Sequence, residues 1–205
     1  GDGRGRGRGR GRGQGRRGSS AHHSPPPLSP VLIALREAEN LQQRGERRKG
    51  AEAVALYRQS TECFQRAIGL GPSEPGDILE AHFGLGESLQ SWATELLSVG
   101  RSAPDEQQSA EQEAACASSA LGLLQQAVQA FSQVVDADGQ LRVDAALNSA
   151  NCLSAASELV TDGAAAEGML RQALDAFNVA RAKEEDALTL GNMADAYVKL
   201  GEVGC

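Results

Sequence analysis

The fold is decided by residues 173–201, ALDAFNVARAKEEDALTLGNMADAYVKLG. Phe177 and Ala180 lie three residues apart, as do Ala194 and Tyr197 beyond the acidic EED turn, so each pair shares one face of a helix. The small residue of such a pair lets two helix backbones approach, and the large residue covers the same face one turn away. The stretch therefore predicts two helices that pack closely against each other.

The same offsets recur twice upstream. Phe64 and Phe131 occupy the place of Phe177, so three of the four phenylalanines hold one equivalent position. Large side chains at that position are expected to be the main packing residues between paired helices. The predicted repeat core consists of Phe64, Ala67, Gly86, Leu89, Phe131, Ala150, Leu153, Phe177, Ala180, Ala194 and Tyr197.

This pattern resembles the tetratricopeptide repeat (TPR), a helix–turn–helix unit of about 34 residues with small and aromatic positions at these offsets. The resemblance spans about 35–202 and is strongest over 140–202. The three phenylalanines are 67 and then 46 residues apart, and the family's Trp position holds His82, Ala146 and Leu190. The resemblance therefore implies a divergent array, and a generic Ala-rich helical bundle is the alternative.

Helical periodicity covers the chain after residue 30, and no segment has the alternation of a strand. Because short turns join the helices, neighbours must run antiparallel. We predict an all-α protein of about seven helices, with antiparallel pairs stacked as a TPR-like α-solenoid over 31–205. The expected helices are 31–44, 51–69, 77–99, 105–135, 141–160, 165–182 and 186–202.

Residues 1–30 form a second region with the opposite charge. They hold seven arginines and one aspartate, a charge of +6, whereas the whole chain carries −7, which leaves −13 on 31–205. Alternating Gly and Arg cannot bury enough surface to offset the entropy lost on folding, so we expect a disordered tail and a Pro-rich linker. The tail arginines are Arg4, Arg6, Arg8, Arg10 and Arg12, then Arg16 and Arg17.

Two interpretations of this tail are open. It resembles the arginine–glycine boxes of RNA-associated proteins, because Arg-rich segments bind RNA phosphates weakly and without sequence preference. It lacks the Phe or Tyr that would stack on bases. The alternative is a low-complexity segment with no dedicated role, or translated repetitive DNA at the edge of a fragment, and it is favoured because composition alone is weak evidence for RNA binding.

Catalytic and metal-binding motifs are missing from the sequence. There is no HExxH, P-loop or GxSxG, and the four cysteines are too far apart for a CxxC pair. Free cysteines within helix patterns indicate a reducing compartment, so we expect an intracellular protein, cytoplasmic or nuclear. No apolar run is long enough to cross a membrane. We predict a non-enzymatic protein without cofactor, metal or membrane contact.

The resemblance to TPR proteins implies a concave groove lined by the first helix of each pair. Its acidic and amide side chains imply a basic or neutral peptide or protein partner. A protein-interaction scaffold is therefore the predicted function, and an RNA-associated protein acting through its tail is the alternative. The groove residues are Glu87, Asp144, Asn148, Asn151, Asn192, Asp195 and Lys199.

The C-terminal helix pattern carries Tyr197 and Leu200 but has no following helix to cover them. We expect both side chains to be more exposed than their equivalents Leu89 and Leu153. The sequence also lacks an initiator Met, so we expect a fragment of a longer array, truncated at this end and able to self-associate through it.

Overall fold

The computed structural model describes residues 28–72, 74, 76–102, 106–134, 139–182 and 187–203. All regular structure in these residues is helical, and the prediction of an all-α protein with seven helices is confirmed for them. The predicted tail, including Arg4 to Arg12, lies outside the described residues. The helices are α1 (Pro30–Glu46), α2 (Ala51–Leu70), α3 (Asp77–Arg101), α4 (Glu106–Ser132), α5 (Gln140–Ser157), α6 (Gly163–Arg181) and α7 (Ala187–Val203).

Local sequence explains where several helices begin and end. Ser29 caps α1 by accepting a hydrogen bond from the Leu32 backbone N–H at 3.2 Å, and Pro30 fills the first helical position, where no N–H is needed. Asp162 caps α6 in the same way, through the Ala164 N–H at 3.0 Å. Gly71 ends α2 with a φ of 78°, a conformation that a side chain would disfavour.

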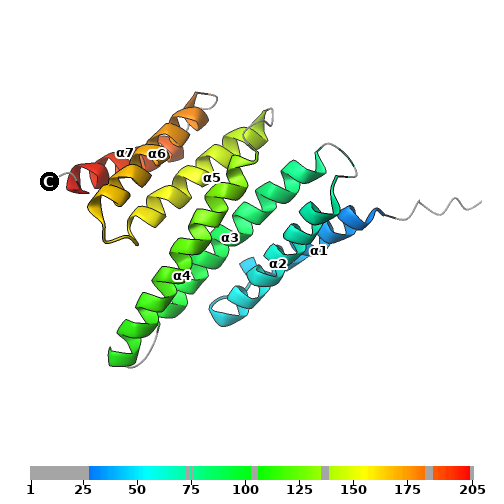
Figure 1. The fold of residues 1–205 in the computed structure, drawn as a ribbon, viewed down its shortest axis with the longest axis horizontal. Helices are drawn as coiled ribbons and strands as arrows, with labels where there is room; N and C mark the ends of the chain where they lie inside the picture. Colours follow the sequence, from blue (N-terminus) through cyan, green and yellow to red (C-terminus); the bar gives the residue numbers. More distant parts are fainter. Residues whose placement is uncertain are drawn as a thin grey trace, which may run out of the picture.

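The helices lie in chain order, with α1 and α7 at opposite ends of the molecule (Figure 1). Consecutive helices run antiparallel, and the most extensive contacts lie within the pairs α1–α2, α3–α4 and α5–α6. The first helices of the pairs also meet, because α1 contacts α3, α3 contacts α5, and α5 contacts α7. Helices α1, α3 and α5 therefore each lie next to the helix two places further along the chain.

Phenylalanines pack against small residues at the centre of this arrangement. A Cβ at Gly84 would lie 2.3 Å from the Phe64 ring of α2, and a Cβ at Gly86 would lie 2.6 Å from the Phe131 ring of α4. Phe131 also meets Phe83 edge to face, with ring centroids 5.7 Å apart. The α3 backbone is therefore in contact with an aromatic side chain on both sides.

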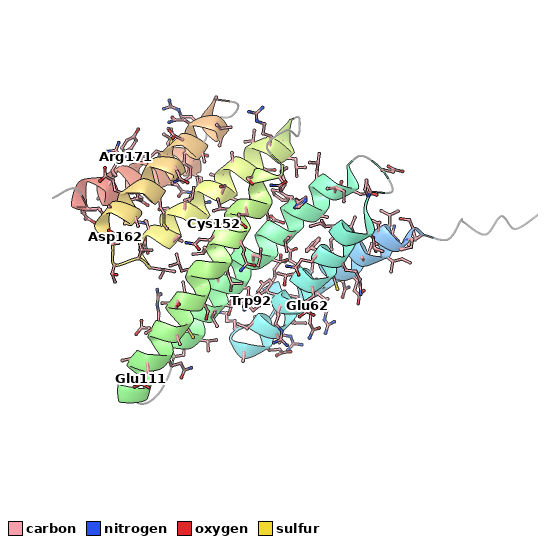
Figure 2. All side chains as sticks on the ribbon, in the orientation of Figure 1. Glu62, Trp92, Glu111, Cys152, Asp162 and Arg171 are labelled. Carbon is pink, nitrogen blue, oxygen red and sulfur yellow. The ribbon has the colours of Figure 1, made fainter. Side chains whose placement is uncertain are left out.

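A second, smaller core lies at the α5–α7 end. Phe177 is fully buried there and packs with Ala150, Leu170 and Met193. Helix α5 also supplies Cys152 to the larger core of α1–α5, so it joins the two (Figure 2). Of the other residues predicted for the repeat core, Ala67, Leu89 and Leu153 also belong to these clusters, and Gly86 and Ala180 are buried outside them. Two residues in α7 differ.

Those two residues correct the predicted core. Ala194 is exposed and Tyr197 is 55% exposed, so their assignment to the packed core is wrong. The buried residues of α7 are Thr189, Met193 and Ala196, because among the described helices α7 packs against α6 and, to a smaller extent, α5. The expectation that Tyr197 would be more exposed than Leu89 is confirmed, since Leu89 is 2% exposed.

No helix among the described residues is both long enough and apolar enough to cross a membrane.

Candidate functional site

A polar concavity lies where α1, α2, α3 and α5 meet. It is a cleft of about 360 Å³. We call it the acidic cleft, because its described lining holds three carboxylates and no lysine or arginine. The lining residues are Gln42, Glu46, Tyr57, Glu87, Gln90, Ser91, Thr94, Glu95 and Asn148.

Hydrogen bonds between α1, α2 and α3 lie next to the acidic cleft and include its lining residue Gln42. The Ser60 hydroxyl donates to the Ala38 carbonyl oxygen at 2.8 Å and lies 3.0 Å from the Ser88 hydroxyl. Ser88 donates to the Gln42 side-chain oxygen at 3.3 Å. Ser60 and Ser88 are fully buried, so their hydroxyls need these partners. The network therefore joins α1, α2 and α3.

Glu87 is a half-buried carboxylate of the acidic cleft. Its only described partner is the Gln42 side-chain amide, which donates to it at 3.4 Å. Burial raises the pKa of Glu87, and the negative charges of Glu46 and Asp144 raise it further, while the Gln42 bond partly offsets them. The ionised form of Glu87 is therefore under-compensated, and a cation entering the cleft would stabilise it.

Tyr57 and Glu95 also line the acidic cleft. Burial raises the pKa of Tyr57, and nearby Glu46 and Glu95 raise it further against a hydrogen bond with Ser91. The Tyr57 hydroxyl therefore stays protonated at neutral pH. Glu95 Oε2 accepts a hydrogen bond from the Gly50 backbone N–H at 2.8 Å, which connects α3 to the turn between α1 and α2.

The structure divides the predicted groove residues into two groups. Glu87 and Asn148 line the acidic cleft, and Asp144 is close enough to affect Glu87 electrostatically. Asp144 itself accepts a hydrogen bond from Gln140 at 2.9 Å. These three residues therefore act within one local electrostatic environment.

The second group lies on α5 and α7. The Asn192 amide donates to the Asn151 side-chain oxygen at 3.0 Å. Lys199 forms an ion pair with Glu158 and donates to the Ser154 hydroxyl at 3.3 Å. Asp195 is exposed. Asn151, Asn192 and Lys199 thus already have partners within the protein, and a ligand would have to replace them.

Sequence reasoning missed Glu95, Ser91, Thr94 and Tyr57 as site residues. Glu95 lies two turns beyond Glu87 in α3, so its place on the same side of the helix could have been inferred from helical spacing. The inward position of Tyr57 has a different signal: Gly45, whose absent Cβ leaves room for the tyrosine ring. A Cβ there would lie 2.9 Å from that ring.

His82 is the one histidine among the described residues. Burial lowers its pKa, and its Nδ1 atom has no hydrogen-bond partner among the described groups. It lies in a cleft of about 320 Å³ on α2, α3 and α4, where most of the polar neighbours are glutamines. No described carboxylate lines that cleft.

The thiols of Cys63 and Cys152 are buried. Burial raises the pKa of Cys152 to about 12 and also raises that of Cys63, so both are protonated at neutral pH. A protonated thiol is a poor nucleophile and a poor metal ligand. The described residues include no group of three or more His, Cys, Asp or Glu that could hold a metal ion.

Comparison with protein-family models, with curated proteins and with solved structures gave no match to this chain.

Proposed function

We propose that this chain is a non-enzymatic, TPR-like protein-interaction scaffold that binds a basic peptide in the acidic cleft. The observation that carries this proposal is the cleft itself, where Glu46, Glu87 and Glu95 converge without a described cationic partner in the lining. Carboxylates on a concave wall focus a negative potential that attracts lysine or arginine side chains.

The helix contacts support a TPR-like α-solenoid. In such an array the first helices of successive pairs line one concave surface. Here α1, α3 and α5 meet in sequence, and they supply eight of the nine residues that line the acidic cleft, Tyr57 being the exception. A ligand bound there would touch several repeats at once, which is how extended peptides gain affinity from many small contacts.

The lining suits an extended peptide in a second respect. Asn148, Gln42 and Gln90 offer both hydrogen-bond donors and acceptors to a peptide main chain. The carboxylates then select for positive side chains. Amide and carboxylate groups together favour a peptide over a small inorganic cation.

Peptide binding can be measured by fluorescence anisotropy with three labelled decapeptides in which Ala alternates with Lys, Gln or Glu. The Lys peptide should bind at least about tenfold more tightly than the Gln peptide, with a steep loss on adding salt. The variant with Glu46→Gln, Glu87→Gln and Glu95→Gln should lose this preference. Glutamine keeps the hydrogen-bond acceptors that Gly50 and Gln42 use, so the fold should be retained.

A matched control removes three charges elsewhere. Glu111, Asp175 and Glu202 are exposed on α4, α6 and α7, and Figure 2 shows Glu111 near the far end of the α3–α4 hairpin. The Glu111→Gln, Asp175→Asn, Glu202→Gln variant should bind the Lys peptide as the natural chain does. Equal loss in both triple variants would mean that net charge, and not the acidic cleft, governs binding, and would overturn the proposal.

A further inference from the structure

The chain carries its own basic segment. Residues 4–17 contain seven arginines and no acidic residue, whereas residues 31–205 carry a net charge of −13. Residues 4–17 lie outside the described residues, so their composition and their distance along the chain are what count here. Guanidinium groups pair with carboxylates through two parallel hydrogen bonds, so this composition matches the lining of the acidic cleft.

The negative charge of the acidic cleft is not met by nearby basic residues. Arg47, Arg48 and Lys49 lie in the adjoining turn with exposed side chains, and Arg48 pairs with Glu52 at 3.4 Å. The charges that raise the pKa of Glu87 are those of Glu46 and Asp144. The described residues around the cleft therefore leave its negative charge uncompensated.

The segment can reach the acidic cleft. Arg17 precedes Leu28, the first described residue, by eleven residues, and a chain of that length spans at most about 36–40 Å. Helix α1 has 17 residues, a length of about 25 Å, and Glu46 is its last residue. The arginines before Arg17 have still more chain to use. A tethered segment of this kind is present at an effective concentration on the order of millimolar.

We propose that the Arg-Gly segment, residues 4–17, occupies the acidic cleft of its own chain and must be displaced by a basic partner. The inference rests on the proposed function and specifies its regulation: the segment sets the affinity that a partner needs. Glycine between the arginines lets the backbone approach the cleft wall, since it has no Cβ to hold it away.

The test uses a fluorescein-labelled synthetic peptide of residues 1–18 and full-length chains. One chain is natural, and a second, the tail variant, has all seven tail arginines replaced by glutamine. The peptide should bind the tail variant at least about tenfold more tightly than the natural chain, because the natural tail competes from a high effective concentration. Adding Glu46→Gln, Glu87→Gln and Glu95→Gln to the tail variant should reduce binding about tenfold or more, and adding the Glu111, Asp175 and Glu202 control set should not.

Two results separate this inference from the proposed function. Equal affinity of the peptide for the natural chain and the tail variant would overturn the inference and leave the proposed function standing. If neither this peptide nor the alternating Lys peptide binds the tail variant, both are overturned.

RNA is the competing ligand for the tail. Binding of a labelled 15-nucleotide oligouridine tests this alternative. If the tail sits in the acidic cleft, neutralising the cleft frees it, so the cleft triple variant with a natural tail should bind this RNA several-fold more tightly than the surface control set. Identical RNA affinity for those two variants would show that the cleft does not hold the tail, and would overturn the inference.

Discussion

Helices α3 and α7 carry two versions of one sequence pattern, which is buried in α3 and exposed in α7. In α3, Gly86 and Leu89 are buried, because α2 and α4 cover the helix on both sides. In α7, Ala194 and Tyr197 are exposed, because the described contacts of α7 come from α6 and α5 alone. The pattern thus provides a helix face that is able to pack. That face is buried only where a second neighbouring helix covers it.

The largest expected effect tests the packed side of this comparison. Phe131 is 2% exposed and fills the space left by Gly86. Phe131→Ala should lower the free energy of unfolding by about 3–5 kcal/mol, because it leaves a cavity that the rigid helices cannot close. Urea unfolding measures this loss. Val198→Ala on the exposed face of α7 is the control and should cost less than about 0.5 kcal/mol. A loss below about 1 kcal/mol for Phe131→Ala would contradict the described packing.

Leu89 and Tyr197 give the direct comparison at equivalent positions. Leu89→Ala should cost about 2–5 kcal/mol because Leu89 is buried. Tyr197→Ala should cost less than about 1 kcal/mol, since more than half of the side chain is already in water. Both are measured as shifts of the urea midpoint at constant slope. Similar costs at the two positions would mean that Tyr197 is covered in solution.

A smaller effect is expected at the close approach of α3 and α4. Gly86→Ala gains about 1 kcal/mol of helix propensity but forces a Cβ against the Phe131 ring, which costs about 1–3 kcal/mol, so a net loss of about 1 kcal/mol is expected. Gly122 in α4 is the matched control, because a Cβ there meets no atom within 4 Å. Gly122→Ala should stabilise by about 0.5–1 kcal/mol. Thermal unfolding of the two variants should therefore shift in opposite directions.

The sequence was sufficient to predict those features that depend on residues close together along the chain. Helical spacing predicted seven helices, and the structure has seven within the described residues. Spacing could not give the inward face of α7, because Met193 and Ala196 are as compatible with burial as Ala194 and Tyr197 until α6 selects one side. The acidic cleft was only partly predictable, since it depends on how α1 lies against α3.

His82 gives a pH test of the packed helix. Burial lowers its pKa below the ordinary value of about 6.5. The unfolded chain therefore binds a proton at His82 more readily than the folded chain does. The contribution of neutral His82 to the free energy of unfolding should be fully present above about pH 6.5 and should be lost as the pH falls below that value. His82→Gln should flatten this part of the profile of melting temperature against pH. An unchanged slope in that variant would assign the loss to other groups.

The smallest expected change in melting temperature is at Glu87 in the acidic cleft, and the sign of that change is the informative result. The pKa of Glu87 is raised by burial and by Glu46 and Asp144, so the folded state holds its proton more strongly than the unfolded state does. Stability should then rise as the pH falls through the folded pKa, and at pH 7 the ionised carboxylate should cost stability. Glu87→Gln removes that cost and keeps an acceptor for Gln42, so its melting temperature at pH 7 should be higher than that of the natural chain while Lys-peptide binding weakens. On α7, Asp195→Asn makes the same chemical change at an exposed site and should leave both nearly unchanged. A lower melting temperature for Glu87→Gln would mean that the carboxylate stabilises α1 against α3, and Glu87 would then be a structural residue and not one kept for binding.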